Sequence, residues 1–325
     1  MYPPFNRRQI LRAIAAAPLA STAAFAQSDW PSREIKIVVP LPAGGGVDVF
    51  VRSVAEQMGA SLGKSVIVEN KPGAGGLIGV KAVTSAPPDG YQVAYVHAGI
   101  VTVQAMTGRL DMLKELKMVA RLSYSPFAMV VRTDSPYKTA QELIAAVQAS
   151  PGKLTYGSGG QGSPAHLVVE HMEGRLGNFK ALHVPYKGAI ETANAMVGGQ
   201  VDFSVSLLGG MMPLIQGGKL RVLAVTGGSR HPLLPDVPTL SESSLPGFTF
   251  EPWGGLAVPA GTPDAVVQRL SKAAQAAMGS APVTQMMQRQ GSVAQFVDGP
   301  AFTVQLARDI PIEQALVKRL GMTGG

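Results

Sequence analysis

Val38-Val39-Pro40-Leu41-Pro42-Ala43-Gly44-Gly45-Gly46-Val47-Asp48 joins an apolar run to a glycine-rich loop and to the start of a helical pattern. The apolar residues 35–39 are mostly β-branched and predict a buried strand, which Pro40 ends. Beyond the glycines, apolar residues return at helical spacing, at Val47, Val51, Val54, Met58 and Leu62. A strand, a tight loop and a helix in this order are typical of an α/β protein with mostly parallel strands.

A second unit of the same kind is Leu154-Thr155-Tyr156-Gly157-Ser158-Gly159-Gly160-Gln161-Gly162-Ser163-Pro164-Ala165-His166. Glycines let the backbone turn sharply and approach a ligand closely. The N–H groups at a helix N-terminus, together with the helix dipole, favour an anion. The two loops therefore predict a site for one or two carboxylates. For either loop alone, a plain connection from strand to helix is an equally compatible interpretation.

The rest of the chain continues this alternation of strands and helices. Further strands are predicted at 66–68, 91–96, 127–131, 154–156, 181–184, 201–205, 220–225 and 256–258. Thr139 and Glu142 match a capping box at the start of a helix, and Thr262-Pro263 predicts the start of another. The stretch 229–247 is rich in Pro and Ser and predicts a long loop, whereas 300–321 predicts a final helix. We expect an α/β fold with mixed, mostly parallel sheets.

The composition is that of a folded globular chain. Of its 325 residues, 46% are hydrophobic and 15% are charged, which allows a sizeable core and, at this length, two domains. The absence of cysteine excludes disulfides, thiolate metal sites and cysteine nucleophiles. Because no basic run is interleaved with aromatic residues, nucleic acid is not an expected partner.

The first residues predict a signal peptide. Three arginines within 7–12 precede a short apolar stretch at 13–20, and Ala24-Phe25-Ala26 follows as a cleavage site, with cutting expected after about Ala26. Arg7-Arg8 also resembles a twin-arginine signal, so the general secretory and twin-arginine routes both stay open. Removing 1–26 takes away three arginines and no acid, so the formal net charge falls from +7 to +4. We expect a periplasmic protein.

Three kinds of catalytic or cofactor site are not expected. The second loop matches the dinucleotide fingerprint G-x-G-x-x-G, but the next strand ends at Lys187 and not at an acid. His166 and His171 lie five residues apart, so on a helix their rings diverge by about 140° and do not match a zinc motif. No G-x-S-x-G elbow and no acid–base carboxylate pair occurs. We expect no catalytic residue, no metal and no cofactor.

A series of motifs runs through nearly the whole chain in one order. They are Trp30-Pro31-Ser32-Arg33-Glu34-Ile35, the loop from Val39 to Asp48, Val68-Glu69-Asn70-Lys71-Pro72-Gly73-Ala74-Gly75-Gly76, Pro88-Asp89-Gly90-Tyr91, Gly157-Ser158 to His166, Val184-Pro185-Tyr186-Lys187-Gly188, Gly198-Gly199-Gln200-Val201-Asp202, Leu234-Pro235-Asp236-Val237-Pro238-Thr239 and Pro259-Ala260-Gly261-Thr262-Pro263. In these motifs the chain resembles the Bug family of periplasmic receptors, the solute-binding components of tripartite tricarboxylate transporters.

The resemblance implies a two-lobe periplasmic-binding-protein fold of the Venus-flytrap type, similar to type II. Residues 27–131 and 250–325 would form lobe 1 and residues 132–249 lobe 2, with crossings near Val131 and Phe250. By position, it also implies that the ligand carboxylate is held by two groups of residues. These are Leu41, Ala43, Gly44, Val47 and Asp48 in lobe 1, and Ser158, Gln161, Gly162, Ser163 and His166 in lobe 2.

The chain departs from the family pattern at three positions. Family members commonly have a threonine where Val47 stands, a small residue near His97, and an aspartate aligned with Ser206. The missing aspartate removes a partner for a ligand amine, so a mono- or dicarboxylate, aromatic acids included, fits better than an amino acid. His97 could add a hydrogen bond or a positive charge. His97 and Ser206 therefore complete the candidate site.

From these features we expect a monomeric solute-binding protein that is not an enzyme. It would capture a small carboxylate for the membrane permease subunits of a tripartite tricarboxylate-type transporter. Two alternatives are a ligand-sensing receptor for a signalling partner and an exported α/β enzyme. The second lacks the nucleophile and base that it would need.

Overall fold

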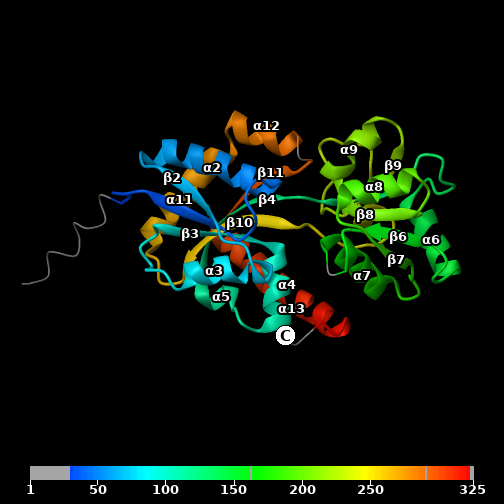
Figure 1. Cartoon of the computed structure of the whole chain (residues 1–325), viewed down its shortest axis with the longest axis horizontal. Coiled ribbons are helices and arrows are strands. Elements are labelled where there is room, and N and C mark those ends of the chain that lie inside the picture. The colour runs from blue at the N-terminus through cyan, green and yellow to red at the C-terminus, as the bar shows by residue number, and fades with distance from the viewer. Residues whose placement is uncertain (1–29, 162, 290, 323–325) are drawn as a thin grey trace, which may run out of the picture.

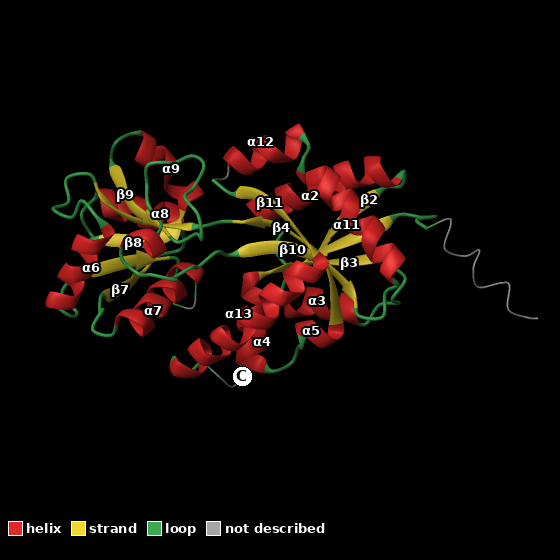
Figure 2. Ribbon diagram, turned by 180° about the vertical axis from the view of Figure 1, so that it is seen from behind, coloured by secondary structure: helices red, strands yellow, loops and turns green. Residues whose placement is uncertain are grey.

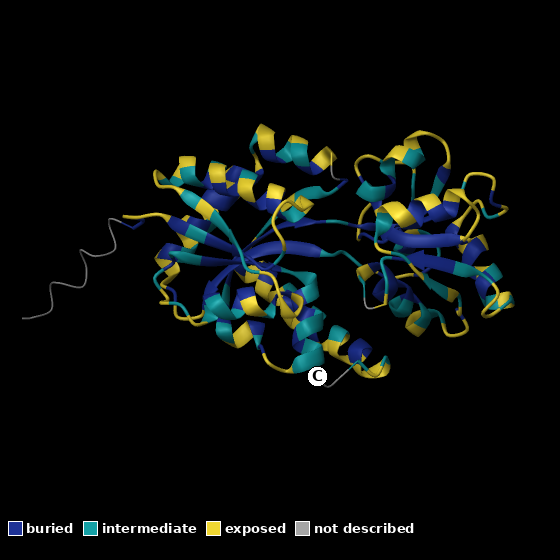
Figure 3. Cartoon of the chain, viewed as in Figure 1, coloured by how far each residue is buried: buried dark blue, intermediate teal, exposed yellow. Residues whose placement is uncertain are grey.

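Two α/β lobes lie side by side and are joined by two chain crossings (Figure 1). The computed structural model describes residues 30–161, 163–289 and 291–322. The signal peptide expected at 1–26 and the candidate residue Gly162 lie outside the described residues. Buried residues fill the central strands of both sheets, and the exposed residues lie on the outer faces of the helices and in loops (Figure 3).

Lobe 1 is built on a six-stranded sheet of order β11-β4-β10-β3-β1-β2. Its strands are β1 (Ile35–Val39), β2 (Val66–Asn70), β3 (Gln92–His97), β4 (Leu116–Tyr124), β10 (Trp253–Pro259) and β11 (Val293–Asp298). One face is covered by α2 (Gly46–Leu62), α11 (Asp264–Met278) and α12 (Ala281–Arg289). The other face carries η1 (Ala74–Gly76), α3 (Leu77–Thr84), α4 (Ala98–Thr107), α5 (Met112–Glu115) and α13 (Gly299–Arg319). Figure 2 shows the two helical layers.

Lobe 2 is built on a five-stranded sheet of order β7-β6-β8-β5-β9. Its strands are β5 (Phe127–Arg132), β6 (Thr155–Ser158), β7 (Leu182–Pro185), β8 (Phe203–Leu207) and β9 (Leu220–Val225). One face is covered by α6 (Ala140–Ala149), α7 (Pro164–Leu176) and α10 (Leu240–Ser243). The other is covered by α8 (Ala189–Val197) and α9 (Leu208–Gln216). The α/β class and the mixed sheets are as predicted from the sequence.

The carboxyl ends of the parallel strands in both sheets point at the other lobe. In lobe 1, β1 to β4 run in one direction and β10 and β11 run in the other. β4 ends where the chain leaves for lobe 2, so all four carboxyl ends lie at that edge. In lobe 2, β5 starts at the facing edge, and β6 to β9 run opposite to it and end there. Loops that follow these strands therefore meet between the lobes.

The crossings differ partly from the expected positions. β4 ends at Tyr124 and β5 begins at Phe127, so the first crossing lies at 125–126 and not near Val131. The strand predicted at 127–131 exists, but it pairs with β8 and β9 and thus belongs to lobe 2. The second crossing lies at 251–252, next to Phe250, whose N–H still donates to Thr226 O in lobe 2.

Several local expectations also needed correction. β4 and β11 were not predicted, and the predicted loop at 229–247 contains α10. Thr139 does accept from the N–H of Glu142, but the Glu142 carboxylate accepts from Lys138 N, so the capping box is only half formed. The Thr262 hydroxyl donates to Pro259 O and does not cap α11.

Side chains also link the lobes outside the two crossings. Nε2 of His231, a buried residue of lobe 2, lies 3.2 Å from Gly291 O in lobe 1. On α7, the His171 Nε2 lies 3.4 Å from the carboxylate of Glu313 on α13. These contacts support the relative orientation of the lobes in this structure.

Candidate functional site

A topological switch point lies in lobe 1 between the adjacent strands β1 and β3. β1 leads into α2, which packs on one face of the sheet, whereas β3 leads into α4 on the other face. The loops that follow the two strands therefore diverge and leave a crevice at the strand ends. In open α/β sheets, ligands bind in such crevices. Loop 41–46 forms one side of this crevice and His97 the other.

Lobe 2 repeats this arrangement between β6 and β8. β6 leads into α7 on one face and β8 leads into α9 on the other. Loop 159–163 forms one side of this crevice, and Ser206 and Leu207 at the end of β8 form the other. The sequence-predicted residues that the structure describes are thus brought together, in each lobe, at one crevice, and the two crevices lie on the facing edges of the lobes.

Helix N-termini gather at these crevices. α2 and α4 begin there in lobe 1, and α7 and α9 begin there in lobe 2. A helix N-terminus carries a partial positive charge and N–H groups without partners inside the helix, so it attracts anions. Neither Lys nor Arg occurs in 41–48, 97–99, 158–166 or 206–208. The site can therefore bind an anion through N–H and O–H donors without cationic side chains.

Loop 41–46 is exposed from Pro42 to Gly46, and the buried carboxylate of Asp48 holds it from below. Oδ2 of Asp48 accepts from Gly44 N at 2.9 Å and from Arg52 Nε at 3.0 Å. Oδ1 accepts from Asn70 Nδ2 at 2.9 Å, and the same amide donates to Leu41 O. Burial alone would raise the pKa of Asp48, but the hydrogen bonds from Arg52, Gly44 and Asn70 outweigh it and hold the pKa below its usual value. Asp48 therefore supports the loop and is already occupied by protein donors.

Loop 159–163 is held by the hydroxyl of Ser158, which is fully buried. This hydroxyl accepts from Gly160 N at 3.1 Å and lies 2.7 Å from Nε2 of His183. Ser163 caps α7 by accepting from His166 N, and Pro164 follows in the first turn. Ser158 and Ser163 thus set the loop conformation from its two ends.

Two histidines lie beneath this loop. The rings of His166 and His183 are 4.6 Å apart, and the His183 ring stacks on Tyr156 at 4.9 Å. Burial lowers the pKa of His166, against the attraction of Glu170. Burial, with a further contribution from His166, lowers the pKa of His183. Both rings are therefore neutral at pH 7, and they form an uncharged support for the loop.

His97 ends β3 and caps α4. Its Nδ1 accepts from Gly99 N at 3.2 Å, and its ring lies 6.4 Å from that of Tyr95. Burial lowers the pKa of His97 to about 4, so the ring carries no charge at neutral pH. A neutral ring favours the hydrogen bond over the positive charge, which were the two roles predicted for His97.

Ser206 lies at the end of β8 and is buried. Its hydroxyl is 2.6 Å from that of Ser204, which donates to Gly157 O. Because the Ser204 proton is used, Ser206 donates to Ser204 and keeps its own lone pairs. The two serines link the β8 side of the crevice to the strand that precedes loop 159–163.

The remaining predicted residues have simpler environments. Leu41 and Val47 are half-buried and pack on the core of lobe 1, whereas Ala43 and Gln161 are exposed. Two supporting residues were not predicted, namely Asn70 and His183. Asn70 lies in the motif Val68-Glu69-Asn70-Lys71, and a polar residue directly after a strand could have identified it.

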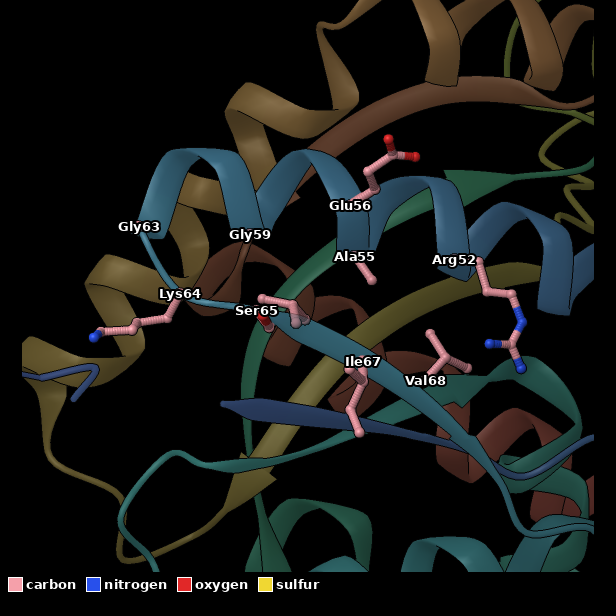
Figure 4. Close-up of a pocket in the computed structure, with 10 residues that line it drawn as sticks. Arg52, Ala55, Glu56, Gly59, Gly63, Lys64, Ser65, Ile67 and Val68 are labelled. Carbon is pink, nitrogen blue, oxygen red and sulfur yellow. The ribbon is translucent and has the colours of Figure 1, made fainter. Parts of the chain in front are cut away.

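A groove of about 660 Å³ lies elsewhere in lobe 1, between α2 and the edge strand β2. Figure 4 shows the Arg52 side chain reaching from the helix toward the strand near Val68, whereas the Glu56 carboxylate points away from the strand. Ser65 directly precedes β2, and Ile67 and Val68 belong to it. The groove runs toward the C-terminus of α2, which is the negative end of the helix dipole. It therefore lacks the features that make the interlobe crevices favourable for an anion.

No helix in 30–161, 163–289 or 291–322 is long and apolar enough to cross a membrane. Nor do the described residues contain a group of three or more His, Cys, Asp or Glu side chains placed to hold a metal ion.

Comparison with known proteins identifies the family. Residues 50–322 match the model of the tripartite tricarboxylate transporter family receptor. The chain belongs to this family. Its members are binding proteins, so the chain is a solute-binding receptor and not an enzyme, and receptors of the family are periplasmic.

Two curated relatives are similar over most of their length. A UPF0065 protein from the gbd 5' region of Cupriavidus necator is 36% identical over 97% of this chain and 96% of its own. BugT of Bordetella pertussis is 30% identical over 81% of this chain and 82% of its own. These matches confirm the resemblance to the Bug family.

Three solved structures share the fold. A TctC solute-binding protein from Polaromonas, without ligand, has a TM-score of 0.83 at 34% identity and covers 89% of this chain and 99% of its own. A Rhodopseudomonas palustris protein with adipate has a TM-score of 0.70 at 28% identity, covering 90% and 99%. MatC of the same organism, with malate, has a TM-score of 0.69 at 27% identity, covering 89% and 100%. The two-lobe binding-protein fold is therefore confirmed.

Proposed function

We propose that this receptor captures a small carboxylate between its lobes and delivers it to the permease subunits of a tripartite tricarboxylate-type transporter. The observation that carries the proposal is the convergence of four helix N-termini on two facing crevices, where the segments 41–48, 97–99, 158–166 and 206–208 contain neither Lys nor Arg. Related receptors were solved with adipate and with malate, both of which are dicarboxylates.

The proposed ligand contacts are the residues predicted from the sequence, in two roles. Exposed loop residues, among them Ala43, Gly44 and Gln161, meet the carboxylate with backbone or amide donors. Asp48, Ser158 and His166 act from below, because each is buried. Because Ser206 has no negative charge and His97 is neutral, the crevices offer no counter-charge to a ligand ammonium. Mono- and dicarboxylates, aromatic acids included, should thus bind better than amino acids.

Ligand capture would involve a rotation of one lobe on the other about the crossings at 125–126 and 251–252. The permease would recognise the closed form. We further propose that the chain is exported by the signal peptide at 1–26 and acts as a monomer.

A thermal-shift screen of residues 27–325 tests the proposal. The panel contains citrate, C4–C6 dicarboxylates, aromatic acids, acidic amino acids and nicotinate, with NAD and ATP as controls. A ligand that binds only the folded state stabilises it by about 2.7 kcal/mol at a hundredfold excess over its dissociation constant. We expect a shift with one class of carboxylate and none with the nucleotides. A shift with NAD or ATP alone would overturn the proposal.

A further inference from the structure

The place of His97 makes it part of the lobe 1 crevice. It is the last residue of β3, which pairs with β1 in the register Val38 to Ala94, so His97 lies next to the strand that leads into loop 41–46. Alternate residues of a strand share a face, and Tyr95 belongs to the core beneath α2. The His97 ring is therefore on the side of the sheet from which α2 and its loop arise.

The contacts of His97 determine which ring nitrogen carries the proton. Nδ1 accepts from Gly99 N, so its lone pair is used and it carries no hydrogen. A neutral imidazole then carries its proton on Nε2. The ring lies flat against the first turn of α4, since a Cβ added at Gly99 would come within 2.9 Å of Cε1 and 3.0 Å of Nδ1. Gly99 thus leaves the space that the ring occupies.

The Nε2–H group has no acceptor in the described part of the chain, although the atom is buried. An N–H removed from water without a partner costs free energy, and native structures keep few of them. His231 has the same local arrangement, because its Nδ1 accepts from the backbone N–H of Leu233, two residues later in the chain. Its Nε2, however, has a partner in Gly291 O. His97 has the same local arrangement at the mouth of the crevice, but its donor lacks a partner.

We propose that His97 is a specificity-determining residue whose Nε2–H donates to an oxygen of the bound carboxylate ligand. The inference rests on the proposed function and adds the chemistry of one contact. A neutral N–H group can donate to a carboxylate, carbonyl or hydroxyl oxygen, whereas it disfavours an ammonium group, which is itself a donor. A ligand with a second oxygen function should therefore be preferred over the matching amino acid.

A purely structural role of His97 as the cap of α4 predicts a different pattern of variants. His97→Asn places an amide oxygen near the position of Nδ1 and can still cap α4. His97→Gln places an amide nitrogen near the position of Nε2 and keeps a donor, but not the cap. If the proposal is right, the asparagine variant keeps the thermal stability of the wild type but loses ligand affinity. The glutamine variant keeps the ligand affinity but loses thermal stability.

The experiment is isothermal titration of the wild-type chain and both variants with adipate, L-malate and L-aspartate. Adipate or L-malate should bind the wild type more tightly than L-aspartate. His97→Gln should keep the affinity within about threefold, whereas His97→Asn should lose about tenfold or more. In ¹⁵N-labelled wild-type protein, adding the acid that binds should shift the ¹⁵N resonance of His97 Nε2. The ¹⁵N resonance of Nδ1 should remain at the position of an unprotonated ring nitrogen.

Each contrary outcome has a separate meaning. If the wild type binds adipate or L-malate and His97→Asn binds it equally well, the donor role of His97 is wrong and the proposed function stands. If affinity is lost only in proportion to thermal stability, His97 is a cap and nothing more. If the wild type melts normally and binds no carboxylate in this set or in the larger panel, the proposed function fails, and the inference about His97 fails with it.

Discussion

Replacing Asp48 by asparagine should strongly destabilise lobe 1, although the two side chains have the same shape. The carboxylate accepts three N–H groups, from Gly44, Arg52 and Asn70. An amide has one acceptor oxygen. If that oxygen faces Gly44 and Arg52, its NH₂ group faces the Nδ2 of Asn70. Asn70 cannot turn over to match, because its Oδ1 accepts from Arg52 and its Nδ2 donates to Leu41 O.

The expected loss follows from these contacts. One hydrogen bond to a buried charged acceptor is removed, which costs about 2 kcal/mol. The bond from Gly44 changes from charge-assisted to neutral, which costs about 1 kcal/mol more. The weakening of the bond from Arg52 adds little to the loss of stability, because half of the Arg52 side chain is exposed to water. We expect the free energy of unfolding to fall by about 3 kcal/mol at pH 7.

Urea unfolding of the two proteins, followed by circular dichroism, measures this difference. Asp134→Asn is the control, because Asp134 pairs with Arg132 at 2.8 Å but is 70% exposed, and such pairs contribute about 1 kcal/mol at most. The folded-state pKa of Asp48 is lowered, so its contribution exists above the pKa of the unfolded chain and disappears as the pH falls through the folded pKa. The gap should therefore close in acid. A difference below about 1 kcal/mol at pH 7 would refute the reasoning.

Three further results are expected. Burial lowers the folded-state pKa of four histidines, namely His97, His166, His183 and His231, so the unfolded chain binds more protons than the folded one. The free energy of unfolding, measured in urea, should therefore fall as the pH drops from 7 to 5, and a value that does not change with pH would contradict this. Gly157→Ala should cost about 1–3 kcal/mol, since a Cβ there would lie 2.7 Å from Cγ2 of the buried Thr192, and an unchanged urea midpoint would show that lobe 2 adapts. Thr239→Ala removes the full capping box of α10 and should lower the free energy of unfolding by about 1 kcal/mol, whereas Thr239→Ser should retain most of it.

The glycine loops could be predicted because their signals are local. A β-branched run, a proline or glycine turn and a helical repeat occur within a dozen residues, and each constrains its neighbours. β4 and β11 escaped prediction because their signals depend on distant parts of the chain. Residues 116–124 are buried except for the half-buried Lys117, and they mix Lys117 and Arg121 with apolar residues. The buried guanidinium of Arg121 donates to Gln305 and Gln295, which lie 184 and 174 residues further along the chain.

The candidate site shows the same limit. The positions of Asp48, Ser158 and His97 could be inferred from motifs, but their roles could not. Whether Asp48 meets the ligand or supports the loop depends on Asn70, which joins the network from another strand. Whether His97 is charged depends on its burial, and no neighbouring residue in the sequence reveals that. The family could be predicted from the order and spacing of the sequence motifs. The chemistry of each contact could not, because it depends on how the side chains pack in the folded protein.

The placement of charge in the two crevices has a consequence for how the receptor releases its ligand. A site lined with cationic side chains would bind a dicarboxylate tightly through long-range attraction in the open and the closed state alike. Here the donors are N–H and O–H groups at the ends of helices, and they act over short distances. Under the proposed function, only closure would bring both sets of donors to one ligand, so affinity would depend on the angle between the lobes. A permease that holds the lobes apart would thereby lower affinity without having to compete for the carboxylate.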